Sequence, residues 1–146
     1  MPFVVAREGA VQVLGELLAS GEDWQLGLYN SAFTPTEADT ASTYTSREAA
    51  FSGYSRKTLA RGVGAGKWSA PALAAPSGSP AWTGRGQVAR SSYAGQSWTV
   101  GATGDAVHGY FVLGATSGKL ILAGSFDTPR TVASGDVLSV TPVVEM

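Results

Sequence analysis

A chain of 146 residues, 44% of them hydrophobic, can form one domain around one core and is too apolar to be disordered. Only 14% of the residues are charged, against about 25% in a typical soluble domain, and the formal net charge is −1. The chain has no cysteine and one histidine, which excludes disulfides, thiol catalysis and a histidine-rich metal site. We therefore expect a single domain, residues 1–146, that uses no cofactor.

No apolar run approaches the roughly 18 residues that a membrane-spanning helix needs. Residues 1–12 have no basic region ahead of an apolar stretch and no cleavage pattern of a secretory signal peptide. We expect the chain to remain unsecreted and to have no membrane partner.

The one helix that the sequence predicts spans residues 8–19, because its leucines and valines recur at helical spacing. Gly21 supplies the left-handed conformation that ends such a helix. Ahead of the helix, residues 1–7 form an N-terminal arm, which is either a strand of the chain's own sheet or an anchor in a neighbouring subunit. The apolar residues of this arm are Phe3, Val4 and Val5.

From Trp24 onward the period changes to two, which is typical of strands. Strands are predicted at residues 24–30, 51–59, 87–93, 96–101, 107–113, 119–126 and 137–144, with another around Trp68. Loops, turns or bends are expected at residues 31–48, 71–80, 114–118, 127–129 and 135–136. The sequence thus predicts a mainly β chain, an antiparallel β-sandwich of about seven to nine strands with one short N-terminal helix.

Residues 107–113 and 119–126 flank a Gly-rich turn and are predicted to form a hairpin. Both faces of its arms are apolar. Such a hairpin is either central and covered on both sides or part of a contact between subunits, and Tyr110 is our candidate residue for that contact.

Charge is distributed unevenly along the chain. Residues 49–104 contain six of the ten basic residues and none of the eleven acidic ones. Antiparallel folding can interleave this segment with the acidic remainder, or a basic face can meet an acidic face of another subunit. Because the bases are dispersed and the pI is about 5.7, we expect no nucleic-acid partner.

The sequence offers no complete catalytic or metal-binding motif. Residues 61–67, RGVGAGK, lack the first glycine and the following serine or threonine of a phosphate-binding loop. The carboxylate pairs Glu22–Asp23 and Glu37–Asp39 lie in polar, loop-like sequence, where solvated charge is the usual explanation. We therefore predict that the chain is not an enzyme.

Single aromatic residues and the one histidine have simple structural interpretations. His108 has no G-x-S-x-G motif to serve and is interpreted as an ordinary strand residue. Trp82, in the loop SPAWTGRG with Arg85, is the best candidate for an exposed anchor, because tryptophan and arginine dominate interface hot spots. The tryptophans expected in the core are Trp24, Trp68 and Trp98.

The motifs of the chain, in order, are TYT, FSGY, KTL, a tryptophan, SYAGQSWT, VHGYFV, LILAGSF and PRTVASGDVLSVTP. This series resembles a family of small tailed-bacteriophage virion proteins, of the capsid decoration or head-surface type. The resemblance extends from the helix to the C-terminus, and its motifs are strand and turn signatures.

The resemblance implies a structural protein that binds and stabilises the assembled capsid, without catalysis. Its partners would be the major capsid protein and copies of itself, as a homo-oligomer for which a trimer is one candidate. The chain would be made in the host cytoplasm and located in the virion, on the capsid surface. The alternative is a phage tail protein or a receptor- or carbohydrate-binding module. The expected interface residues are Phe3, Val4, Val5, Trp82, Arg85 and Tyr110.

Overall fold

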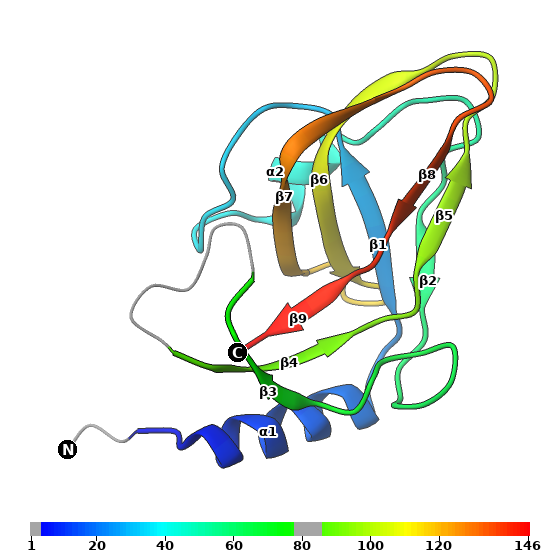
Figure 1. The fold of residues 1–146 in the computed structure, drawn as a ribbon. Coiled ribbons are helices and arrows are strands. Elements are labelled where there is room, and N and C mark those ends of the chain that lie inside the picture. Colours follow the sequence, from blue (N-terminus) through cyan, green and yellow to red (C-terminus); the bar gives the residue numbers. More distant parts are fainter. Residues whose placement is uncertain (1–3, 78–85) are drawn as a thin grey trace.

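The computed structural model describes residues 4–77 and 86–146. In this part of the chain, nine strands form three antiparallel sheets, and the longer of two helices lies near the N-terminus (Figure 1). The predicted mainly β fold with one short N-terminal helix is confirmed. The elements are α1 (Arg7–Ala19), β1 (Trp24–Tyr29), α2 (Ala41–Thr45), β2 (Lys57–Leu59), β3 (Ala72–Ala74), β4 (Val88–Ser92), β5 (Gln96–Thr99), β6 (Asp105–Gly114), β7 (Leu120–Val132), β8 (Val137–Val140) and β9 (Val143–Glu145).

The largest sheet has the strand order β2-β1-β6-β7, so β6 is central and β7 lies at an edge. A second sheet has the order β3-β4-β9, and β5 pairs with β8 in a third. Helix α1 packs on β4 and β3, and Figure 1 shows it on the side of these strands away from the four-stranded sheet. The apolar hairpin is therefore central in its first arm, as one of the two sequence interpretations expects.

Two clusters of buried side chains lie on the two faces of β1 and β6. The larger one contains Trp24, Trp68 and Trp98, and α1 contributes Leu14 and Leu18 to it. The smaller one consists of Tyr29, Tyr44, Phe111 and Leu113. The prediction that the three tryptophans are core residues is confirmed.

Gly27 makes room for the ring of Phe111 between the two central strands. The two residues are partners in the β1-β6 register, and a Cβ atom on Gly27 would overlap the Phe111 ring. We expect Gly27→Ala to lower the free energy of unfolding by about 1–3 kcal/mol, because a fully packed site must shift to accept the methyl group. Urea titration measures this loss. Gly15→Ala in α1 is the control, since its Cβ meets no atom within 4 Å; equal midpoints for the two variants would contradict the packing.

The segment 31–48 contains a helix, so the prediction of a surface loop is wrong in part. Tyr44 of α2 is fully buried, and its ring centroid lies 5.4 Å from that of Tyr29 and 5.5 Å from that of Phe111. The Thr43 Oγ1 atom accepts a hydrogen bond from the Thr40 N–H at 3.2 Å, which fixes the first turn. A polar, threonine-rich sequence can therefore form a helix here because one buried tyrosine holds it on the sheet.

The last strands also differ from the prediction. The bend expected at 127–129 does not end β7, which continues to Val132, but it falls where the pairing of β7 with β6 is interrupted. Pro129 lies in this unpaired stretch of an edge strand, where a missing backbone N–H is tolerated. Val107 pairs with Arg130 and Gly109 with Ser125, so residues 126–129 of β7 lie opposite His108 alone and form a bulge in β7. Pro142 divides the predicted strand 137–144 into β8 and β9, which belong to different sheets.

The structure also differs from the sequence prediction in three segments nearer the N-terminus: residues 51–59, the surroundings of Trp68, and residues 71–80. Residues 51–54 form a turn with Gly53 at a φ of +92°, and only Lys57–Leu59 forms a strand. Trp68 makes isolated bridges rather than lying in a strand. The expected loop 71–80 includes the short strand β3.

The basic segment is interleaved with the acidic remainder. Arg56 forms an ion pair with Glu48 at 2.7 Å, and Arg90 forms one with Glu145 at 2.7 Å. The Arg61 side chain donates to a backbone carbonyl of the acidic segment at 3.1 Å and lies over the Trp24 ring. For these three arginines, antiparallel folding therefore interleaves the basic segment with the acidic remainder, as one of the two sequence interpretations expects.

Candidate binding cleft

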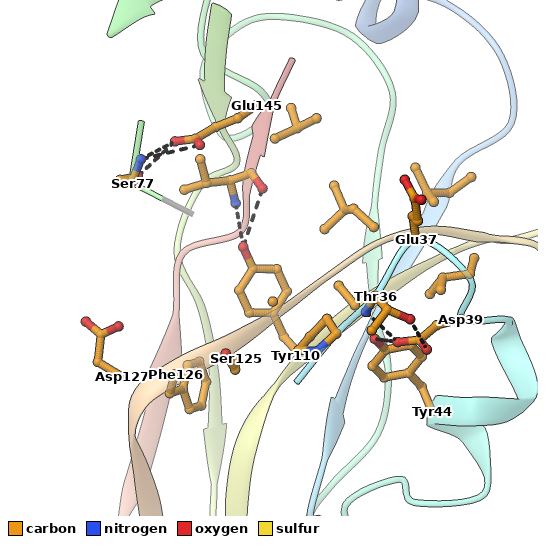
Figure 2. A pocket seen from close by; sticks show the side chains of 18 of the residues that line it. Thr36, Glu37, Asp39, Tyr44, Ser77, Tyr110, Ser125, Phe126, Asp127 and Glu145 are labelled. Carbon is orange, nitrogen blue, oxygen red and sulfur yellow. Dashed lines mark hydrogen bonds between the residues drawn. The ribbon is translucent and has the colours of Figure 1, made fainter. Parts of the chain in front are cut away.

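An open cleft of about 1230 Å³ runs along β7, the edge strand of the four-stranded sheet. It brings together β7, residues 35–39, β9 and the end of α1, which are far apart in sequence. Figure 2 shows Ser77 and Glu145 on one side, Thr36, Glu37 and Asp39 on the other, and Tyr110 between them.

Residues 120–123 of β7 provide an apolar floor at the edge of the four-stranded sheet. Among the described residues, only β6 pairs with β7. Ile121 is 39% exposed, and Leu17 of α1, which lines the same cleft, is 41% exposed. Exposed backbone donors and acceptors along such an edge can pair with a further extended chain.

Tyr110 ties the cleft wall to β9. Its hydroxyl donates to the Val143 carbonyl at 3.4 Å and accepts from the Val143 N–H at 3.2 Å. Burial raises the pKa of the Tyr110 hydroxyl, and the hydrogen bond with Val143 partly offsets this rise. Tyr110 therefore holds two sheets together, and its ring contributes to the cleft beside Phe126, with centroids 6.4 Å apart.

Asp39 is committed to the fold of the opposite wall. Its carboxylate accepts hydrogen bonds from the Thr36 N–H at 3.0 Å, the Thr36 hydroxyl at 2.8 Å and the Tyr44 hydroxyl at 2.7 Å. The bond from the Thr36 backbone and then that from Tyr44 hold the pKa of Asp39 below its usual value. The pair Glu37–Asp39 therefore does not present two equivalent carboxylates to a ligand.

Glu145 is committed in a similar way on the β9 wall. It accepts hydrogen bonds from the Ser77 N–H at 3.1 Å, the Ser77 hydroxyl at 2.9 Å and the Arg90 Nε–H at 2.8 Å. Burial raises the pKa of Glu145, but the bonds from Arg90 and Ser77 together outweigh burial and leave the pKa below its usual value. The group thus joins β9, β4 and the start of the adjoining loop.

The other early carboxylate pair lies outside this cleft and is also structural. The Glu22 carboxylate accepts hydrogen bonds from the Thr116 N–H at 2.6 Å and the Ser117 N–H at 2.8 Å. The Asp23 carboxylate accepts one from the Arg61 N–H at 3.0 Å. Together they attach the β6-β7 turn and the glycine-rich loop to the start of β1.

The rim of the cleft carries exposed charge. Glu37 and Asp127 are exposed and form no ion pair with a described residue. Arg130 lies over the Phe126 ring at 5.3 Å. The cleft thus combines an apolar floor, a strand at the edge of its sheet and a partly acidic rim.

Metal-binding and membrane-spanning features are absent from the described part of the chain. Within residues 4–77 and 86–146, no three His, Cys, Asp or Glu side chains gather in a way that could hold a metal ion. None of the helices described here has the length and apolar character needed to cross a bilayer.

The predicted interface residues fall in different places. Phe3, Trp82 and Arg85 lie outside the described residues. Val4 and Val5 are 92% and 58% exposed and line a smaller cleft of about 330 Å³, whereas Tyr110 lines the large one. Met146 lines both clefts, so the two adjoin at the C-terminus.

Sequence reasoning did not locate the β7 edge, the central feature of the cleft. A proline in a strand is a signal for an edge, and Pro129 lies in β7. The Asp-Thr-Pro sequence favours a bend, and the β7 bulge includes it, but local pattern does not show that the strand continues beyond it to Val132.

Comparisons of the chain with protein-family models, with curated proteins and with solved structures found no match.

Proposed function

We propose that this chain is a non-catalytic structural protein of a tailed bacteriophage, which binds the major capsid protein on the capsid surface and stabilises the assembled head. The observation that carries the proposal is the cleft along β7, which offers a strand edge and an apolar floor to another polypeptide. The resemblance of the sequence to virion proteins supplies the identity of the partner.

The commitment of the polar groups supports a binding role over a catalytic one. Asp39 and Glu145 both line the cleft, and each accepts three or more hydrogen bonds from its own chain. A general acid or base needs a carboxyl group that is free to exchange a proton with a substrate. Apart from the exposed rim carboxylates Glu37 and Asp127, the described surface that remains for a partner is backbone edge and apolar side chain.

Rigidity of the cleft favours repeated attachment to a lattice. Tyr110 joins β6 to β9, Glu145 joins β9 to β4, and Glu22 fixes the β6-β7 turn. A preformed surface loses little conformational entropy on binding, so weak contacts can add up over many copies of an oligomer.

We expect the attachment to survive high salt. Exposed ion pairs contribute about 0–1 kcal/mol each, and Arg56 and Arg90 are already paired within the chain. A buried apolar side chain contributes about 1.5–3 kcal/mol and is not screened. Virions that carry the chain should retain it at about 1 M salt, where the screening length is about 3 Å.

The measurement is the amount of this chain that sediments with purified particles as salt increases, together with its position in electron micrographs of the virion. Complete release at modest salt would contradict the apolar attachment. A position on the tail would replace the proposed function by the alternative one.

One observation favours that alternative, a carbohydrate-binding module. The Phe126 ring and the exposed carboxylates of Glu37 and Asp127 share the same open cleft, and an aromatic face with a few polar groups suits a small polar ligand. Glycan-array binding that Phe126→Ala abolishes would support it against the capsid role.

A further inference from the structure

Residues 4–6, directly ahead of α1, are exposed. Ala6 has extended backbone angles, φ −63° and ψ 155°, and Val4 and Val5 are 92% and 58% exposed. β-branched residues in an extended backbone favour a place in a sheet, and apolar side chains favour burial. Among the described residues, Val4 has neither a partner strand nor a buried position.

The first half of β7 has the complementary properties. From Leu120 to Ala123 its backbone pairs with β6, and no other strand of residues 4–77 and 86–146 pairs with its outer edge. Ile121 is 39% exposed and Leu17 is 41% exposed, and both line the cleft along this edge. Ile121 and Leu17 line the same cleft and form an apolar strip, the β7 strip, that a neighbouring strand would cover.

We infer that the N-terminal arm of one copy, residues 1–6, adds as a strand to the outer edge of β7 in a second copy and covers the β7 strip. The arm has no acidic residue ahead of Glu8, so it meets the rim carboxylates Glu37 and Asp127 without repulsion. This inference deepens the proposed function, because it specifies how copies of the virion protein assemble.

The geometry favours a second copy over the chain's own arm. Leu17 lies ten residues beyond Arg7, a distance of about 15 Å along the axis of α1. The arm leaves the opposite end of the helix, and Val4 and Val5 lie beside Arg7 and Gln87 rather than beside Leu17. Each copy therefore has one arm to give and one edge to fill, so the contact is head-to-tail and links copies into an oligomer.

Engineered cysteines test the contact directly, because the chain has none of its own. A Val4→Cys protein is mixed with an Ile121→Cys protein and oxidised, and the products are separated without reductant. We expect a disulfide-linked pair of chains at twice 14.9 kDa. Only a contact between copies can produce it, since each chain carries one of the two cysteines.

The matched control mixes Val4→Cys with Val137→Cys, because Val137 is 63% exposed on β8, which does not line the cleft. A yield from the Val4–Ile121 mixture no higher than from this control would overturn the inference. So would a product that forms equally well from Val4→Cys alone.

Light scattering of the purified chain provides the second test. We expect the full chain to be an oligomer, and both deletion of residues 1–6 and Ile121→Lys to reduce it to a monomer, whereas Val137→Lys leaves it unchanged. A full chain that is monomeric, or an oligomer that survives the deletion, would overturn the inference. Neither assay contains capsid, so an arm-linked oligomer that fails to bind particles would overturn the proposed function and leave this inference intact.

Discussion

Replacing Phe111 with alanine should lower the free energy of unfolding by about 3–5 kcal/mol, the largest loss that we expect from a single substitution in this chain. Phe111 is fully buried in the smaller cluster, where its ring meets Tyr44 and lies under the Arg56 guanidinium at 5.7 Å. Removing the ring leaves a cavity between β1 and α2 that Gly27 cannot fill. A domain of this size has about 5–15 kcal/mol of stability in total, so the variant should be close to unfolding.

Urea titration followed by tryptophan fluorescence measures the loss. Phe126→Ala is the matched control, because Phe126 is partly exposed on the cleft and packs against Tyr110. We expect its loss to be clearly smaller. If Phe111→Ala and Phe126→Ala shift the midpoint equally, the smaller cluster does not hold β1, β6 and α2 together.

The helix and the hairpin could be predicted because their signals are local. In α1 the burial of Leu14 and Leu18 follows from helical spacing, and the β6-β7 turn follows from its glycines. The core tryptophans were predicted correctly because each lies in an otherwise strand-like segment.

The rest depends on contacts between distant residues. Helix α2 has no apolar stripe of its own, and it exists because Tyr44 reaches Tyr29 and Phe111. Pro142 marks the end of a strand, but only the sheet order shows that β8 and β9 join different sheets. Tertiary packing has overruled local propensity at both places.

The candidate cleft could be predicted least of all. Of the residues proposed for an interface, Tyr110 alone lines it among those described, and its hydroxyl is used to hold β9. The β7 edge arises from the sheet order, which no local pattern contains. Leu17 becomes a cleft residue because it flanks the buried face of α1.

Stability should fall steeply in acid, because four carboxyl groups have pKa values below their usual range in the folded chain. These groups are Glu22, Asp39, Glu48 and Glu145. A lowered pKa means that the unfolded chain binds more protons than the folded one, so protonation favours unfolding. The stability that these four groups contribute is complete above their ordinary pKa values, 3.8 for Asp and 4.5 for Glu. It is lost as the pH falls through their lower pKa values in the folded chain.

Glu48 isolates one part of this effect. Burial raises the pKa of Glu48, but hydrogen bonds from Arg56, at 2.7 and 2.8 Å, and from the Tyr54 hydroxyl, at 2.6 Å, together outweigh burial. Tyr54 in turn accepts a hydrogen bond from the Leu28 N–H at 3.0 Å, so the network anchors β1. Glu48→Gln should cost about 1–2 kcal/mol at pH 7, allowing for its partial exposure to solvent.

The decisive result is how this difference changes with pH. As the pH falls below 4.5, the carboxyl group of Glu48 takes up its proton more readily in the unfolded chain than in the folded one, where its pKa is lower, so the difference between Glu48→Gln and the wild type should shrink toward pH 3. Urea titrations at pH 7, 5 and 3 measure the convergence. Glu37→Gln is the matched control, since Glu37 is exposed and forms no ion pair with a described residue, and its difference from the wild type should stay near zero at every pH. A constant difference for Glu48→Gln from pH 7 to pH 3 would show that the network acts through packing, because a contribution from the charge must disappear when the charge does.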